Sequence, residues 1–355
     1  MQYPAYLKLY EVLRRQIISG EITPGARLPG KRPLAEQYGV SVLTVAHALD
    51  LLSEEGYISV RERSGCYASY GFSGDFPGPE RNLPVPELQD LPSSADVEGF
   101  PFSLLARAMR RVIQARGSSL LLKAPNQGLP ALRQALSRYL ARSRGISASP
   151  DQIVIAAGAE TLYSRLVDTF GTDRIWAIES PSYEKIEQVY AARQVHLDLL
   201  PLDRNGIRSD ALERTQASVL HVSPYRSFPS DITASASRRA EYLRWGEREG
   251  HLIIEDDFES EFSVRGKPLD TLFSQSARQN IVYLNTFSRT VSAAMRVGYM
   301  VLPAALLPLY QRKAGFYSCT VPVFEQYLLA DLIDQGDFER HIRRVRRKLR
   351  SSPQE

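Results

Sequence analysis

Hydroxyl and basic residues near the N-terminus have the types and spacing expected of a phosphate-binding surface. Ser41 and Thr44 stand at the start of an apolar-periodic stretch, and hydroxyls at a helix N-terminus bind phosphate oxygens together with the free backbone amides there. Arg61 and Arg63 precede Gly65, and glycine permits a close approach between backbone and ligand. These residues predict contact with the backbone of double-stranded DNA.

Three short helical patterns and a hairpin pattern position these side chains. Leu9, Leu13 and Ile17 recur every four residues, which predicts a first amphipathic helix. A second helix is expected over 31–38, and Ser41 is a suitable N-cap for a third. The predicted buried stripe of that third helix is Val45, Ala48, Leu49 and Leu52. Strand-like runs at 57–60 and 66–68 around the turn Ser64-Gly65 complete a winged helix-turn-helix, whose third helix can enter the major groove.

The segment IISGEITPGARLPGKRPLAEQYGVSVLTVAHALDLLSEEGYI resembles the GntR family of bacterial winged-helix regulators over nearly the whole predicted domain. The resemblance implies DNA contacts from the start of the second helix, from the first turns of the third helix and from the wing. These positions are Arg32, Ser41, Val42, Leu43, Thr44, Ala46 and Gly65. Many relatives have arginine where this chain has Val42 and Ala46. Apolar contact with thymine methyl groups and phosphate anchoring are therefore favoured over guanine readout by arginine.

Residues 1–72 are thus expected to form the DNA-binding domain and residues 73–95 a proline-rich linker. From residue 96 to residue 355, short apolar runs alternate with helical stretches. That alternation predicts an α/β domain with a mostly parallel sheet and helices on both faces. The candidate strands are 153–156, 175–178, 196–200, 219–222, 252–254, 281–284 and 299–302. Ligands of such sheets bind at the carboxyl ends of the strands.

This second region resembles the large domain of fold-type I aminotransferases, and the whole chain resembles the MocR subfamily of GntR regulators, in which the two domains are fused. Pyridoxal-phosphate chemistry needs a Schiff-base lysine, a carboxylate for the pyridine nitrogen, a phosphate cradle and an aromatic platform. The resemblance places Gly158, Ala159 and Glu160 at the phosphate, with Arg296 as its basic partner. Tyr183 matches the stacking aromatic and Asp256 the carboxylate.

Several matched positions depart from the enzyme pattern. Arg289 stands at the lysine position, and a guanidinium stays protonated and forms no stable Schiff base. Phe258 replaces a tyrosine, and Asp231 replaces a glycine. Glu160 brings a carboxylate to a place where like charge repels phosphate. The loop that often reads Ser-His-Gln is Tyr225-Arg226-Ser227. The sequence therefore predicts a domain without transaminase activity, in which any cofactor is held non-covalently.

The segment VPVFEQYLLADLIDQGDFERHIRRVRRKLR resembles the helix that leads into the small C-terminal domain of these proteins, a domain expected to be absent here. The fused domains imply a homodimer that binds operator half-sites and senses a phosphorylated or anionic effector. The alternative interpretation is a regulator or aminotransferase that binds pyridoxal phosphate without the lysine.

Composition limits the remaining possibilities. The 355 residues carry a net charge of +4, which permits nucleic-acid binding without requiring it. The two cysteines, Cys66 and Cys319, provide neither a disulfide framework nor a zinc site, so no metal is expected. The sequence contains no long apolar run and no signal-peptide core, which predicts a cytoplasmic protein without membrane spans.

Overall fold

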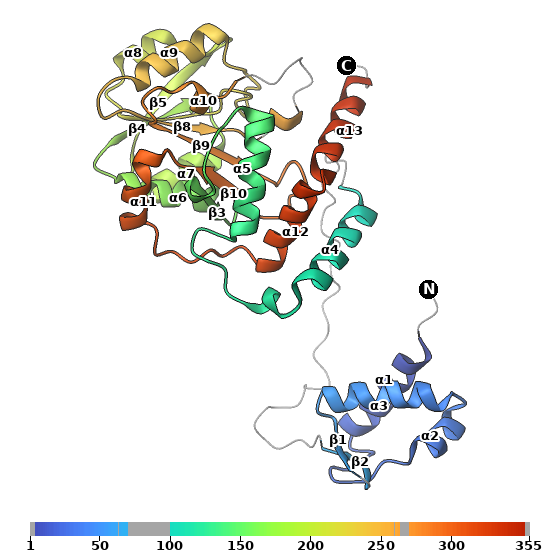
Figure 1. The fold of residues 1–355 in the computed structure, drawn as a ribbon. Coiled ribbons are helices and arrows are strands. Elements are labelled where there is room, and N and C mark those ends of the chain that lie inside the picture. The colour runs from blue at the N-terminus through green and yellow to red at the C-terminus, as the bar shows by residue number, and fades with distance from the viewer. Residues whose placement is uncertain (1–3, 63, 70–99, 259, 263–269, 352–355) are drawn as a thin grey trace. The chain divides into compact units, whose positions relative to one another are not determined.

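A computed structural model describes residues 4–62, 64–69, 100–258, 260–262 and 270–351, and the chain divides into two compact units, Met1–Pro92 and Ser93–Glu355 (Figure 1). Each unit is described by itself. The predicted linker 73–95 and the predicted wing residue Arg63 lie outside the described residues. Among the described residues, no helix has both the length and the apolar character needed to cross a membrane, and no group of metal-ligating side chains occurs.

The first unit has three helices and a two-stranded hairpin, as the sequence predicts. The elements are α1 (Ala5–Ile18), α2 (Lys31–Tyr38), α3 (Val42–Glu54), β1 (Ile58–Arg61) and β2 (Gly65–Ala68). The predicted stripes of α1 and α3 pack together in one apolar core. The Ser41 Oγ accepts a hydrogen bond from the Thr44 backbone N–H at 3.1 Å, which caps α3.

The second unit is built on an eight-stranded sheet of order β3-β10-β9-β8-β7-β4-β5-β6. Four neighbouring pairs, from β9 through β5, are parallel, whereas β10 runs antiparallel to both its neighbours and β6 antiparallel to β5. The strands are β3 (Ile153–Ala156), β4 (Ile175–Ser180), β5 (His196–Asp203), β6 (Gly206–Ile207), β7 (Val219–Val222), β8 (Leu252–Asp256), β9 (Ile281–Thr286) and β10 (Gly298–Val301). The predicted strand 299–302 is thus shifted by one residue.

Helices cover both faces of this sheet (Figure 1). Because strand side chains alternate between faces, Val154 packs with helices α6 and α7, whereas its neighbours Ile153 and Ile155 pack with α5 and α12. The helices are α4 (Phe102–Arg116), α5 (Pro130–Arg144), α6 (Ala159–Phe170), α7 (Glu184–Ala192), α8 (Ser209–Arg214), α9 (Ala236–Gly246), α10 (Leu272–Gln275), α11 (Leu307–Lys313), α12 (Val323–Asp334) and α13 (Asp337–Ser351). Short 3-10 turns are η1 (Gly117–Leu121), η2 (Pro150–Gln152), η3 (Ser260–Phe262) and η4 (Ala304–Leu306).

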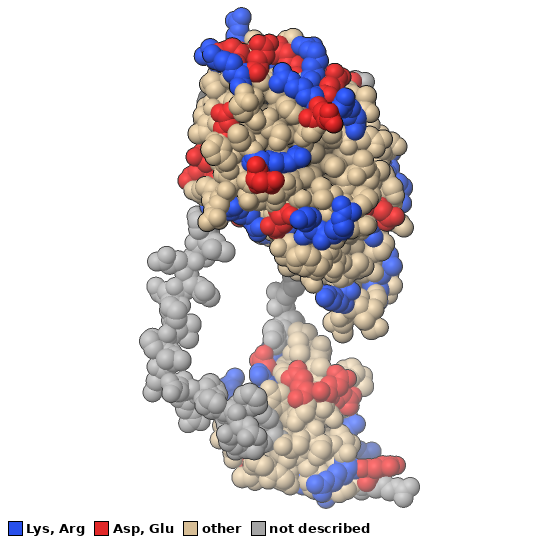
Figure 2. Space-filling model, turned by 90° about the vertical axis from the view of Figure 1, so that its left-hand side faces the viewer, with Lys and Arg blue, Asp and Glu red and all other residues tan. Residues whose placement is uncertain are grey.

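On the face shown in Figure 2, basic and acidic side chains are interspersed over the larger unit. The small net positive charge of the chain is therefore not gathered into one basic field on that face. Local arrangements of charge have to be read residue by residue.

Candidate functional sites

The start of α3 presents apolar side chains to solvent. Val42 is 45% exposed and Leu43 is 66% exposed, although both belong to a helix whose other face is fully buried. The Oγ atoms of Ser41 and Thr44 lie 2.8 Å apart, so the two predicted phosphate-binding hydroxyls are side by side. Ala46 is half-buried and Arg32, at the start of α2, is exposed. Exposed apolar groups next to helix N-terminal hydroxyls make a surface suited to thymine methyl groups and phosphates.

The wing is joined by a third chain segment that the sequence analysis did not predict. Leu28 N–H donates to the Cys66 carbonyl at 2.9 Å and Ala68 N–H donates to the Ala26 carbonyl at 2.9 Å. Arg27 is thereby carried to the wing glycine, where its Nε lies 3.2 Å from the place a Gly65 Cβ would occupy. Gly65 has φ +122°, a backbone conformation that favours glycine. Residues 25–28 show no alternation of apolar and polar side chains, so their pairing with β2 could not be predicted from the sequence.

Tyr67 organises the rest of the wing. The Arg61 guanidinium lies 4.5 Å from the centre of the Tyr67 ring, and the Tyr67 hydroxyl is 2.7 Å from the Ser64 Oγ. A cation over an aromatic face is held in position while its N–H groups remain able to donate. Two arginines, Arg27 and Arg61, are therefore fixed at the wing, one of them predicted and one not.

A pocket of about 340 Å³ opens in the second unit at the carboxyl ends of the strands, where the sequence analysis expected a ligand. It brings together six of the seven predicted cofactor positions, and the seventh, Gly158, is the N-cap of α6 beside it. The pocket is lined by Ala159, Glu160, Tyr163, Tyr183, Ile186, Ser223, Arg226, Phe228, Asp256, Phe258, Thr286, Ser288, Arg289 and Arg296.

Asp256, at the end of β8, is the carboxylate at the floor of this pocket. One of its oxygens, Oδ2, accepts from the Tyr163 hydroxyl at 2.5 Å and lies 3.3 Å from His221 Nε2. His221 is oriented in turn by the Tyr190 hydroxyl, 2.8 Å from its Nδ1. Burial, followed by the Asp256 charge, raises the pKa of both tyrosines, which therefore remain neutral. Tyr163 and His221 were not predicted as site residues, because they are remote from Asp256 in sequence and only the fold brings them close to it.

The residues of the predicted phosphate cradle gather at the start of α6, beside this pocket. Gly158 has φ +81°, and a Cβ there would lie 3.1 Å from Arg296 Nη2, so only glycine lets this guanidinium lie against the first turn of α6. The same Nη2 is 3.4 Å from the Glu160 Oε1. Arg296 and Glu160 are both about half exposed, so the pair is weak and a stronger anion can displace Glu160.

Aromatic residues form the pocket wall. Tyr183 is 42% exposed and meets Phe228 edge to face, with ring centres 6.0 Å apart. Tyr183 therefore lines the pocket with part of its side chain exposed. Arg226 Nε donates to Asp231 Oδ1 at 2.8 Å, and Asp231 has φ +58°. That left-handed backbone explains why a glycine is expected at position 231.

These residues suit part of a pyridoxal-phosphate site. A buried carboxylate, a guanidinium beside a helix N-terminus, and aromatic side chains line this one pocket, and these groups match a planar ring with a phosphate. No lysine lines the pocket within the described residues, and the cation there next to Ser288 is Arg289. The donor set fits non-covalent retention of such a ring and does not fit covalent capture.

The two units match two known families. Residues 5–68 match "Bacterial regulatory proteins, gntR family", and residues 96–354 match "Aminotransferase class I and II". The HTH-type regulator YdeL of Bacillus subtilis is 30% identical over 99% of this chain and 78% of its own length. The pyridoxine biosynthesis regulator PdxR of Corynebacterium glutamicum is 30% identical over 97% of this chain and 76% of its own length. The probable rhizopine catabolism regulatory protein MocR of Rhizobium meliloti is 28% identical over 97% and 74%.

Solved structures agree on the fold of the second unit. Kynurenine aminotransferase of Pyrococcus horikoshii superposes with a TM-score of 0.64 at 23% identity, covering 70% of this chain and 64% of that one. The α-aminoadipate aminotransferase LysN of Thermus thermophilus gives 0.62 at 26% identity, with the same two coverages. The chain thus spans just under two thirds of these aminotransferases and about three quarters of the regulators.

Fold and pocket define a winged helix-turn-helix joined to a fold-type I aminotransferase domain. The chain belongs to the gntR family of bacterial regulatory proteins, and within it to the group with an aminotransferase class I and II domain, consistent with the MocR subfamily.

Proposed function

We propose that this protein is a cytoplasmic, DNA-binding transcription regulator whose aminotransferase-like domain provides dimerisation and effector sensing without transaminase activity. The observation that carries the proposal is the start of α3, where exposed Val42 and Leu43 flank a capped, hydroxyl-bearing helix N-terminus. The names of the relatives, which are HTH-type regulators, support the same function.

The proposed DNA contacts come from three places. The helix starts contribute Arg32, Ser41, Val42, Leu43, Thr44 and Ala46, and the wing contributes Arg61, Arg63 and Gly65. We add Arg27, because its guanidinium lies at the wing glycine. Two such units in a homodimer would read two half-sites of an operator.

The test is a gel shift with the DNA flanking the protein's own gene. Arg32→Ala and Thr44→Ala are each expected to weaken binding about tenfold, since each removes a charge-assisted or amide-linked phosphate contact. Affinity of the unaltered protein should fall steeply with salt through counterion release. Sedimentation of the same protein measures the dimer. Unchanged binding in both variants would contradict the proposed docking of α2 and α3.

A second function, non-covalent binding of pyridoxal phosphate or another anionic ligand, is supported by Asp256 and Arg296, which line the same pocket. Pyridoxamine phosphate is the fairer probe, because it needs no lysine. Glu160→Gln should raise its affinity about threefold to tenfold in calorimetry, because the carboxylate that pairs with Arg296 is removed. Unchanged affinity would mean that the phosphate does not reach Arg296. A visible absorption band that survives dialysis and is fixed by borohydride would contradict the proposed loss of covalent chemistry.

A further inference from the structure

The basic run near the end of the described chain takes no part in either proposed site. On α13, Phe338, Ile342 and Val345 are buried, so the arginines between them are distributed around the remaining faces of the helix. Arg343 and Arg346, one turn apart, line a cavity of about 560 Å³ between α13 and the C-terminal end of α5. We call this cavity the α5–α13 pocket. Its other polar lining residues are Tyr139, Arg142, Ser143, Arg144, Asp270 and Glu339.

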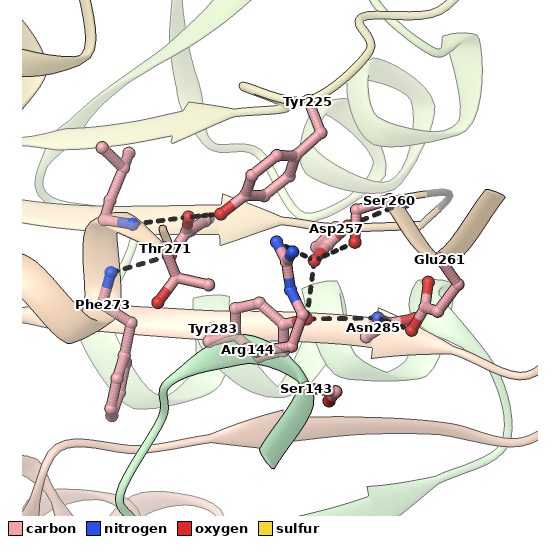
Figure 3. A network of polar contacts seen from close by, with 12 residues as sticks. Ser143, Arg144, Tyr225, Asp257, Ser260, Glu261, Thr271, Phe273, Tyr283 and Asn285 are labelled. Carbon is pink, nitrogen blue, oxygen red and sulfur yellow. Dashed lines mark hydrogen bonds and ion pairs between the residues drawn. The ribbon is translucent and has the colours of Figure 1, made fainter. Parts of the chain in front are cut away.

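The charges of the α5–α13 pocket do not cancel. Arg142 pairs with Glu339 at 2.9 Å. Arg144, which also lines the pocket, pairs with Asp257 at 2.7 Å in the buried network of Figure 3. Among the described residues, no carboxylate lies within ion-pair distance of Arg343 or Arg346. Among the described residues that line the pocket, the carboxylate other than that of Glu339 is the exposed Asp270.

Arg346 is also held in place. Its Nε donates to the Glu261 backbone carbonyl at 2.5 Å, which fixes the guanidinium plane and leaves the two terminal nitrogens available. Burial, the largest effect, lowers the pKa of Arg346. The charges of Tyr139 and Glu261 act against that effect, whereas those of Arg350 and Arg144 add to it. A bound anion would further offset the repulsion among these arginines.

We propose that the α5–α13 pocket binds a small molecule with a doubly charged oxyanion, a phosphate monoester or a dicarboxylate, between Arg343 and Arg346. Guanidinium forks bind such groups through paired N–H···O bonds. The pocket is concave, which suits a metabolite better than the convex backbone of a duplex. It shares no lining residue with the pocket of Asp256 and Arg296, so it is a second site.

Calorimetry of the full chain at constant ionic strength tests this site, with inorganic phosphate and succinate as separate probes. Saturable binding is expected for at least one probe, and the preferred probe tells a phosphate monoester from a dicarboxylate. Arg343→Glu should weaken that binding at least about tenfold, because it replaces an attractive charge by a repulsive one. Arg347→Glu makes the same change of charge on the same helix, outside the pocket lining, and should leave affinity within about twofold.

Three outcomes would overturn the proposal. If Arg343→Glu and Arg347→Glu weaken binding of the probe equally, the effect comes from the net charge of the helix and not from the pocket. Binding that is lost in Arg296→Ala and retained in Arg343→Glu would locate the anion in the other pocket. A protein with no saturable binding of either probe would overturn it as well. None of these results bears on DNA binding, which the gel shift measures independently.

Discussion

The proposed DNA-binding surface of the first unit and the pocket of the second unit differ in how far their polar groups are bonded within the protein. At the start of α3, Val42 and Leu43 are exposed, and the polar side chains are held by close neighbours in the same small unit: Ser41 by Thr44, and Arg61 of β1 by Tyr67 of β2. In the pocket, Asp256 is bonded by Tyr163 and His221, and Arg296 is paired with Glu160. The groups on the first surface therefore remain exposed to a binding partner, whereas Asp256 and Arg296 of the pocket are already bonded within the protein.

The same contrast appears at the end of β8. Side-chain alternation sends Asp256, the last residue of the strand, to the ligand pocket and the next residue, Asp257, to the opposite face. There Asp257 accepts from the Tyr283 hydroxyl at 2.7 Å and pairs with Arg144, inside the network of Figure 3. Burial, the largest single effect, lowers the pKa of Arg144, but the charge of Asp257, together with those of Tyr283, Tyr225 and Glu261, outweighs burial and raises it. Asp257 is therefore expected to hold the fold together rather than to bind a ligand.

The largest expected effect comes from breaking that buried pair. Arg144→Met should lower the free energy of unfolding of the second unit by about 3–5 kcal/mol, because Asp257 is left charged in the interior. Urea unfolding followed by tryptophan fluorescence measures it selectively, since both tryptophans, Trp176 and Trp245, belong to this unit. Arg142→Met, which removes a more exposed pair, should cost less than about 1 kcal/mol. Equal losses would contradict the structural role of Asp257.

The reverse behaviour is expected on the first unit. Leu43→Asp should reduce DNA affinity about a hundredfold, near 2.7 kcal/mol, by exchanging an exposed apolar contact for a charge that repels phosphate. The melting temperature should stay unchanged, because Leu43 is exposed. Fluorescence anisotropy with labelled operator and a thermal melt provide the two measurements. Val12→Asp on α1 is the matched control, and an equal loss there would show that the effect is not specific to α3.

A third prediction concerns pH. Glu179, buried at the end of β4, accepts from the Ser227 hydroxyl at 2.7 Å, and burial raises its pKa to about 7. A raised carboxyl pKa means that the folded state prefers the neutral acid, so stability is full below about pH 4.5 and declines as pH rises to 7. Glu179→Gln should remove about 3 kcal/mol of that decline in urea titrations. Part of the decline should remain in the variant, because burial also raises the pKa of Glu261 to about 7 and raises that of Glu255. A variant with the wild-type pH profile would contradict the buried, neutral Glu179.

Patterns with a clear period predicted much of this fold. The stripe Val45, Ala48, Leu49 and Leu52 is buried, and α2 has the predicted bounds. The order and approximate bounds of the seven candidate strands of the second unit also agree with the structure. The edge strand β6 was missed, because a pair of residues is too short to show alternation.

The partners of the site residues could not be predicted in the same way. Tyr163 lies 93 residues from Asp256 along the chain, and its hydroxyl reaches that carboxylate only because α6 packs beside β8. Arg144 and Asp257 are equally remote in sequence, and neither residue type is expected inside a core. Long-range pairs of this kind have no local pattern, whereas the positions that matched a family motif could be located one by one.

The smallest expected effect separates two roles of the wing glycine. Gly65→Ala should weaken DNA binding about fivefold, near 1 kcal/mol, through backbone strain at φ +122° and through contact between the new methyl group and Arg27. Gly56→Ala is the control for strain alone, because Gly56 has φ +78° and nothing within 4 Å of an added Cβ. Both substitutions are then made in an Arg27→Ala background. If Gly65→Ala acts by displacing Arg27, its loss of DNA affinity in that background should be little larger than the loss caused by Gly56→Ala. If the binding free-energy losses of Gly65→Ala and Arg27→Ala are instead fully additive, the two residues act separately. Gly65 would then be needed for its own close approach to DNA.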